Sequence, residues 1–259
     1  KIKEKMFCLS NPLEQFQLVP LIPLRAGRMD LSFTNSTFFI VWSLTVFLLL
    51  VRLATLNGGG TIVPNRWQSI VEGLYGFVLN LATENIGPKA GLRYFPIVFV
   101  LFTFILCLNL IGMVPYGFTV TRHLIVTLAL SLAVFFGRTY IMFREHKIKA
   151  IGFFLPPGTP FALIPALVVI ELISYFVTIV RLSVRLFANM MRGHIMLKVL
   201  IGFAWTMMTA GTATLFIGHL VPLGVVFLLM GLELAVAVIQ AYVFATLTCI
   251  YISEALELH

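Results

Sequence analysis

The chain has 259 residues, of which 60% are hydrophobic and 11% are charged. Soluble domains carry about 25% charged residues, because polar groups must cover their surface. The composition therefore excludes an ordinary soluble protein and indicates a membrane protein. The net charge of +8 is more typical of lipid headgroup contacts and loop orientation than of nucleic-acid binding, since no cluster of basic and aromatic residues accompanies it.

Hydrophobic runs predict five or six membrane helices, because a bilayer core about 30 Å thick needs about 20 apolar residues per helix. A polar lead-in at 1–32 precedes the first candidate helix at 33–56. Residues 64–86 interleave charged and apolar side chains at spacings of three and four, which predicts an amphipathic helix on the membrane surface. Residues 94–143 contain two apolar runs divided by a short turn, so we expect a helical hairpin there.

The last part of the chain, residues 160–259, is almost continuously apolar. Helical signals run over 161–200, a length of about 60 Å and twice the hydrocarbon thickness. Such a helix must tilt steeply, bend or break, and the same holds for 221–252. Small residues at 209–214 indicate a turn between them. We therefore expect an all-α integral membrane protein, one domain over 1–259, that ends in a hairpin of two long tilted helices.

Charged residues are scarce in this hairpin, and each needs a reason, because a charge at the bilayer centre costs about 2.5 to 3.5 kcal/mol on insertion scales. At about 100° per residue, Arg185 and Asn189 share one helix face, whereas His194 points to the opposite side. Glu171 returns close to the face of Arg185, about 21 Å away along the axis. A carboxylate and an imidazole thus flank one arginine along the same helix.

The second long helix carries a matching set of polar residues. In an antiparallel hairpin, facing residues have numbers that add up to a nearly constant total. This condition predicts three facing pairs: Arg185 with Gln240, His194 with Glu233, and Glu171 with Glu254.

The layout is typical of proton handling. Carboxylates and imidazoles inside a membrane are common members of proton relays, because burial can tune them to change charge. An arginine keeps its charge, so Arg185 can attract a carboxylate or repel a cation but cannot relay protons. A permanent positive charge between two titratable clusters predicts two half-channels instead of one continuous pore.

Other interpretations stay open at this point. Arg181, Arg192 and Lys198 fit a structural role, since long basic side chains snorkel toward the headgroups. An independent ion channel or voltage sensor would use Arg181 and Arg185 on one face, although voltage sensors have longer arginine arrays. A membrane enzyme could use His194 and Glu233, but no HExxH or similar ligand cluster is present. Three cysteines without CxxC spacing indicate neither a disulfide framework nor a metal site.

Several segments resemble subunit a of the F-type ATP synthase family, especially its mitochondrial form. The resemblance rests on RLFANMMRGH at 185–194, the C-terminal LELAVAVIQAYVFATLTCIYISEALELH, and NLIGMVPYGFTVT at 109–121. It extends from NPLEQF at 11–16 to the end of the chain and includes ELISY at 171–175. The matching motifs are specific to this family.

The resemblance implies a proton-conducting stator in the membrane sector, whose two final helices lie against a rotating ring of c subunits. Arg185 matches the family's essential arginine, which faces the ring carboxylate and prevents a leak between half-channels. The resemblance assigns the other positions as follows: Gln240 and Asn189 are polar neighbours of that arginine, His194 and Glu233 belong to the intermembrane-space half-channel, Glu171 and Glu254 to the matrix half-channel, and Asn109 lies near the inlet.

The resemblance also implies partners and a location. The expected partners are the c ring, the peripheral stalk, other membrane subunits, the bilayer and protons, with no cofactor, metal or nucleic acid. The chain itself would catalyse no covalent step, because the ATP sites lie on other subunits. Many bacterial relatives exchange the acid and the histidine at 194 and 233, which favours the mitochondrial inner membrane over a bacterial plasma membrane. Arg181 and Arg192 depart from the family pattern, so their roles stay open.

Overall fold

The computed structural model describes residues 20–23, 25–26, 29–30, 32–55, 64–113, 120–147, 164–209 and 217–256. Its α-helices are α2 (Asn35–Thr55), α3 (Arg66–Ile86), α4 (Pro88–Gly112), α5 (Leu124–His146), α6 (Ile164–Thr209) and α8 (Leu220–Leu256), and the short 3-10 helix η2 (Val120–Arg122) precedes α5. Ahead of α2, β1 (Pro20–Ile22) pairs antiparallel with β4 (Phe33–Thr34), and β2 (Arg25–Ala26) pairs with β3 (Met29–Asp30).

The helices confirm an all-α membrane fold. Within the described residues, α2, α4, α5, α6 and α8 are long and apolar enough to cross a membrane. The predicted amphipathic segment 64–86 corresponds closely to α3, which begins after Asn65, whose side chain accepts a hydrogen bond from the backbone N–H of Arg66. Phe77 of α3 packs against Phe102 of α4 and Tyr242 of α8. One face of α3 therefore joins the bundle.

The start of α4 differs from the prediction. The helix begins at Pro88, whereas the apolar pattern indicated a start at residue 94. Gly87 separates α3 from α4 with φ +101°, a left-handed conformation that side chains other than glycine rarely adopt. Pro88 takes the first helical position, where its missing N–H costs no hydrogen bond. The polar first turns of α4 lack the periodic apolar signal, so the apolar pattern does not include them.

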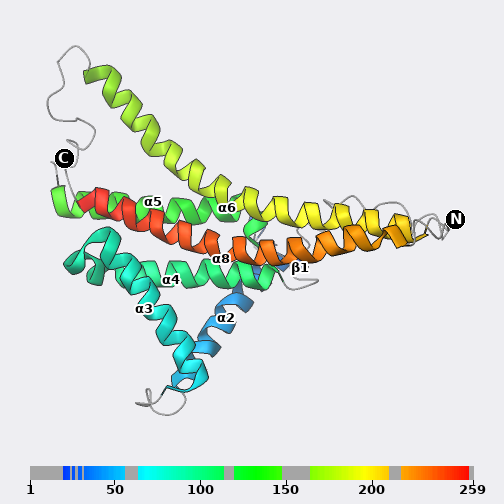
Figure 1. Cartoon of the computed structure of the whole chain (residues 1–259). Coiled ribbons are helices and arrows are strands. Elements are labelled where there is room, and N and C mark those ends of the chain that lie inside the picture. The colour runs from blue at the N-terminus through cyan, green and yellow to red at the C-terminus, as the bar shows by residue number, and fades with distance from the viewer. Residues whose placement is uncertain are drawn as a thin grey trace.

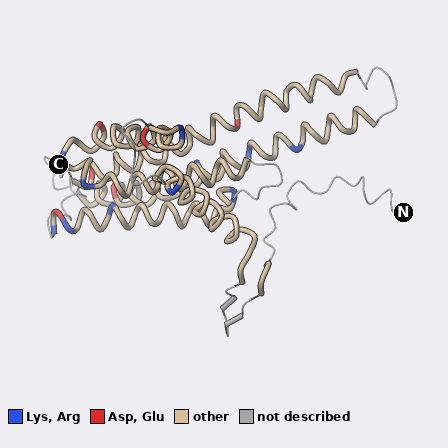
Figure 2. The backbone as a smooth tube through the Cα atoms, turned by 90° about the horizontal axis from the view of Figure 1, so that it is seen from below, with Lys and Arg blue, Asp and Glu red and all other residues tan. Residues whose placement is uncertain are grey.

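The two C-terminal helices are as long as the sequence predicts. Helix α6 has 46 residues and α8 has 37. Figure 1 shows that α6 starts well away from α8, bends near its middle and then runs beside α8 toward the connecting segment. Figure 2 shows the same paired arrangement from another side, with few charged residues along it. The turn predicted within 209–214 lies almost wholly outside the described residues.

A shared apolar core holds the middle of this hairpin against the other helices. Leu186 of α6, Phe244 of α8, and Val98 and Ile105 of α4 are all fully buried in it. Phe47 of α2 contacts the other side of α4 through Phe99. This packing fixes the parts of α6 and α8 that carry the scarce polar residues. The assignment of 1–259 to one domain stays a prediction.

Candidate functional site

A buried acid–base pair joins the two long helices. His194 Nε2 of α6 lies 3.4 Å from Glu233 Oε1 of α8, so the predicted facing pair is confirmed. Glu233 is only 5% exposed. Within the described part of the chain, neither of its carboxylate oxygens accepts a hydrogen bond. A buried carboxyl group with unused hydrogen-bonding capacity is well suited to take up a proton or a water molecule.

The backbone beside this pair provides the room for the carboxyl group. A Cβ atom added at Gly193 would lie 2.7 Å from Glu233 Oε1 and 2.9 Å from its Cδ. Real Cβ atoms essentially never approach other atoms so closely, so any larger residue at 193 would displace the carboxyl group. Gly193 therefore determines where Glu233 sits relative to His194.

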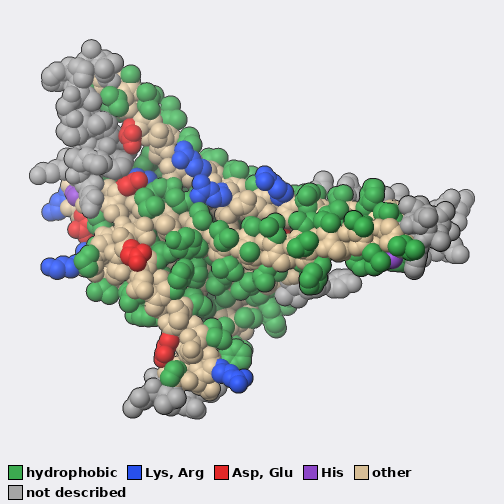
Figure 3. All heavy atoms as spheres, viewed as in Figure 1, with side chains coloured by type: hydrophobic (Ala, Val, Ile, Leu, Met, Phe, Trp, Pro, Cys, Tyr) green, Lys and Arg blue, Asp and Glu red, His purple; other side chains and the backbone are tan. Residues whose placement is uncertain are grey.

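A second polar contact lies about one helical turn from Arg185. The side-chain amide of Asn189 donates a hydrogen bond of 2.7 Å to Gln240 Oε1. Gln240 thus binds Asn189, which shares the helix face of Arg185, while Arg185 itself is half-buried. The predicted facing of Arg185 and Gln240 is off by about one turn of α6. Figure 3 shows basic side chains spaced along α6 on an otherwise mostly apolar surface.

A third helix contributes to the same region. Asn109 of α4 is fully buried, and its amide donates a hydrogen bond of 3.2 Å to the backbone carbonyl of Ala237. Ala237 lies on α8 one turn after Glu233 and about one turn before Gln240. Asn109 therefore lies beside α8 at the level of the pair, and its place near the inlet stays a prediction.

The carboxylate at the end of α8 has a partner that the sequence did not indicate. Arg138 of α5 donates a hydrogen bond of 2.9 Å from Nη2 to Glu254 Oε2. Glu171 is half-buried on the first part of α6, the part that starts away from α8 in Figure 1. The facing of Glu171 and Glu254 stays a prediction.

One more buried charge belongs to this region, and the sequence did not indicate it. Arg122 of η2 is 5% exposed, and burial lowers its pKa to about 10, although the negative charge of Glu233 opposes this shift. Burial and the charge of Arg122 together lower the pKa of the neighbouring His123. At neutral pH, Arg122 is thus a positive charge within electrostatic range of Glu233, and His123 is neutral.

These contacts define a class of protein. Two long membrane helices carry a buried histidine–carboxylate pair, an amide pair and a half-buried arginine along one interface, with a salt-bridged carboxylate at the far end. Within the described residues, no group of three or more His, Cys, Asp or Glu side chains is arranged to hold a metal ion. The geometry is that of a multi-pass membrane protein with ionisable groups at several depths, which is typical of ion-translocating proteins.

Comparisons with known proteins identify the family. The family model for the ATP synthase A chain matches residues 37–253. ATP synthase subunit a-2 of Arabidopsis thaliana is 50% identical over 258 residues, which cover 98% of this chain and 74% of that protein. ATP synthase subunit a of Brassica napus is 51% identical, with 96% of this chain and 97% of that protein covered. ATP synthase subunit a of Marchantia polymorpha is also 51% identical, covering 96% and 99%.

The chain belongs to the ATP synthase A chain family. The resemblance drawn from the motifs at 109–121, 171–175, 185–194 and 232–259 is thereby confirmed.

Proposed function

We propose that this chain conducts protons through two offset half-channels and couples their passage to the rotation of a ring of c subunits. The observation that carries the proposal is the line of polar contacts between α6 and α8. His194–Glu233 and Asn189–Gln240 join the two helices, and Arg185 lies one turn from Asn189. Titratable groups thus flank a permanent charge, as two separated proton paths require.

The inlet half-channel would use His194, Glu233 and Asn109. Each of the two titratable side chains can hold or release a proton when its surroundings favour the change. Asn109 holds the α8 backbone between Glu233 and Gln240 in place. A proton that reaches Glu233 then has a short route along α8 toward the ring carboxylate.

The outlet half-channel would use Glu171 and Glu254, with Arg185 separating it from the inlet. The positive charge of Arg185 attracts the ionised ring carboxylate and opposes a proton that would cross directly between the half-channels. One charge crossing 100 mV releases about 2.3 kcal/mol, so several protons are needed for each ATP made elsewhere in the complex. The chain itself would make no covalent bond.

The expected partners are the c ring, the peripheral stalk and the other membrane subunits of the complex, within a lipid bilayer. The plant relatives named ATP synthase subunit a support this assembly. They also support a location in the mitochondrial inner membrane. The histidine at 194 and the acid at 233 favour the same location, because they match the mitochondrial form of the family.

Disulfide cross-linking tests the proposed contact with the ring. Met196 lies eleven residues, about three turns, after Arg185 and so shares its face, and it is 51% exposed. In the assembled complex, we expect a cysteine at Met196 to cross-link to a cysteine in the outer helix of the ring subunit. A cysteine at Phe136 on α5, which is also exposed, should not. Cross-links from both positions, or from Phe136 alone, would contradict the proposed docking face.

The room at Gly193 gives a second test. Gly193→Ala should push the Glu233 carboxyl group away from His194 and lower proton flux per assembled complex by on the order of tenfold, since small misplacements of reacting groups are costly. Gly202→Ala is the matched control, because a Cβ there meets nothing within 4 Å. Both changes favour the helix, so loss of flux in Gly193→Ala alone cannot come from a weaker helix. Equal flux in the two variants would show that the carboxyl position does not matter.

A further inference from the structure

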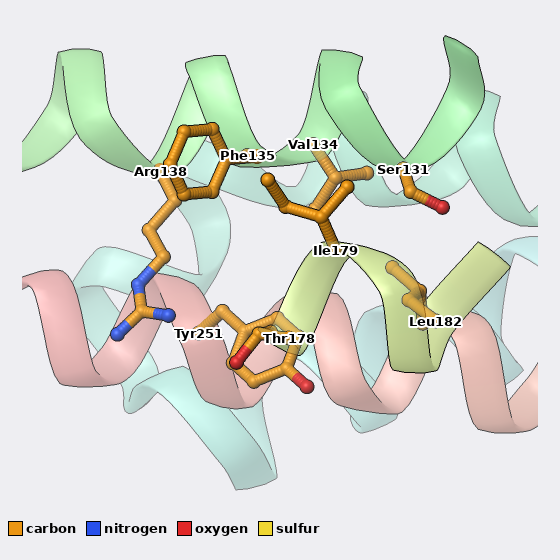
Figure 4. Close-up of a pocket in the computed structure, with 8 residues that line it drawn as sticks. All are labelled: Ser131, Val134, Phe135, Arg138, Thr178, Ile179, Leu182 and Tyr251. Atoms are coloured by element: carbon orange, nitrogen blue, oxygen red, sulfur yellow. The ribbon is translucent and has the colours of Figure 1, made fainter. Parts of the chain in front are cut away.

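A buried arginine outside the helical hairpin holds the outlet carboxylate. Arg138 lies on α5, and its side chain is 6% exposed. Its Nη2 donates a hydrogen bond of 2.9 Å to Glu254 Oε2 near the end of α8. In Figure 4 the side chain leaves α5 and extends across the gap toward α8. The rest of the Glu254 carboxylate is accessible from outside the protein, because the Glu254 side chain is 47% exposed.

Aromatic rings fix the guanidinium of Arg138 in this direction. Its Cζ lies 4.6 Å from the ring centre of Tyr175 on α6 and 5.2 Å from that of Tyr251 on α8. Tyr175 is in turn held by a 2.8 Å hydrogen bond between its hydroxyl group and that of Thr139, next to Arg138 on α5. Cation–π contacts of this kind are strongest where water is excluded. Three helices thus meet at one oriented positive charge.

A small cavity lies beside Arg138. It has a volume of about 10 Å³ for water-sized occupants, room for about one water molecule. Figure 4 shows that side chains of α5, α6 and α8 all line it, and most of this lining is apolar. Arg138 therefore borders a space of the size of water on one side and the Glu254 carboxylate on the other.

We propose that Arg138 is a positioning residue of the outlet half-channel, which acts by holding the Glu254 carboxylate in one orientation with its open side available for proton exchange. This inference rests on the proposed role of Glu254 in proton release. A desolvated arginine needs a carboxylate partner, because an unpaired buried charge is strongly unfavourable. The pair therefore keeps Glu254 on the α5 side of α8, where a lone glutamate on an exposed helix end would sample many rotamers.

The test is a double-mutant cycle in the complete complex in sealed membrane vesicles, with passive proton flux measured per assembled complex. Arg138→Met is expected to lower flux by on the order of tenfold, whereas Arg138→Lys should retain most of it. In a Glu254→Gln background, Arg138→Met should cause no further loss. Arg93→Met is the matched control, since Arg93 forms a 3.2 Å salt bridge with Glu145 of α5 at a more exposed place, and it should leave flux unchanged.

Each outcome bears on the inference. The same proportional loss in both backgrounds, or a lower amount of assembled complex with normal flux per complex, would show that Arg138 only braces the helices and would overturn it. Normal flux in Arg138→Met would overturn it as well. If Glu254→Gln alone reduces flux to background, the double mutant cannot show a further loss, and Arg138→Lys tests the inference instead. A loss of flux in Arg138→Lys as large as that in Arg138→Met would show that a positive charge at 138 does not position Glu254, and would overturn the inference. The proposed function is tested separately, since it requires that Arg185→Ala abolish coupled ATP synthesis.

Discussion

Replacing Arg185 with alanine is expected to abolish ATP synthesis driven by proton flow, while the chain still inserts into the membrane and assembles. Arg185 is half-buried on α6, about one turn from the Asn189–Gln240 hydrogen bond. Loss of its charge removes the proposed attraction for the ionised ring carboxylate and the proposed barrier to a direct passage of protons. ATP synthesis in vesicles with an imposed proton gradient, normalised to the amount of assembled complex, measures the effect.

Arg192→Ala is the control for this variant. Arg192 lies two turns after Arg185, returns to the same helix face and is exposed, so its loss removes an equal charge from the same surface. We expect it to leave coupled synthesis largely intact. Coupled synthesis retained in Arg185→Ala would remove the basis of the proposed mechanism. Loss of synthesis in Arg192→Ala would mean that the working arginine is not unique, which would also decide the role of a residue that departs from the family pattern.

Glu233→Gln is expected to lower proton flux by about 100-fold, the range typical of removing a group that transfers protons. Glutamine has nearly the same shape as glutamic acid, so it fits the space beside Gly193. It cannot take up and release a proton, however, and His194 would face a neutral amide in place of the carboxylate that now lies 3.4 Å away. Passive flux and ATP-driven proton pumping in sealed vesicles provide the measurement.

Glu84→Gln, an exposed position on α3, makes the same chemical change away from the interface and should leave flux unchanged. A Glu233→Gln variant that conducts protons at the normal rate would show that the buried pair is structural. That result would favour the interpretation of His194 and Glu233 as packing partners between α6 and α8.

Much of the fold could be predicted because hydrophobic runs and the bilayer thickness limit the possible helices. The excessive length of the segment after residue 160 predicted a tilted, bent or broken helix, and α6 is bent. The start of α4 could not be predicted in the same way. Its first residues are polar and lie outside the apolar run, so only Pro88 marked the helix start. Apolar patterns locate buried surfaces and are weaker guides to helix ends.

From residue spacing alone, the site was predictable only within the last two helices. Their antiparallel arrangement fixes which residues face each other, and this condition identified the His194–Glu233 pair. Gln240 binds Asn189 and not Arg185, because the antiparallel arrangement fixes which residues face each other only to within about one helical turn. Arg122 and Arg138 were missed, since no sequence rule relates η2 and α5 to the hairpin. Arg138 did leave a signal, because it is a single charge within a predicted membrane helix and such charges require partners.

Side-specific accessibility tests the central claim of two half-channels that open to opposite sides. In a chain whose native cysteines are replaced, one cysteine is placed at Leu197, a turn from His194, and another at Ser253, beside Glu254. Silver ions added to one side of sealed vesicles should block proton flux through the first variant from the inlet side and through the second from the outlet side. Inhibition of both variants from the same side only would contradict two offset half-channels.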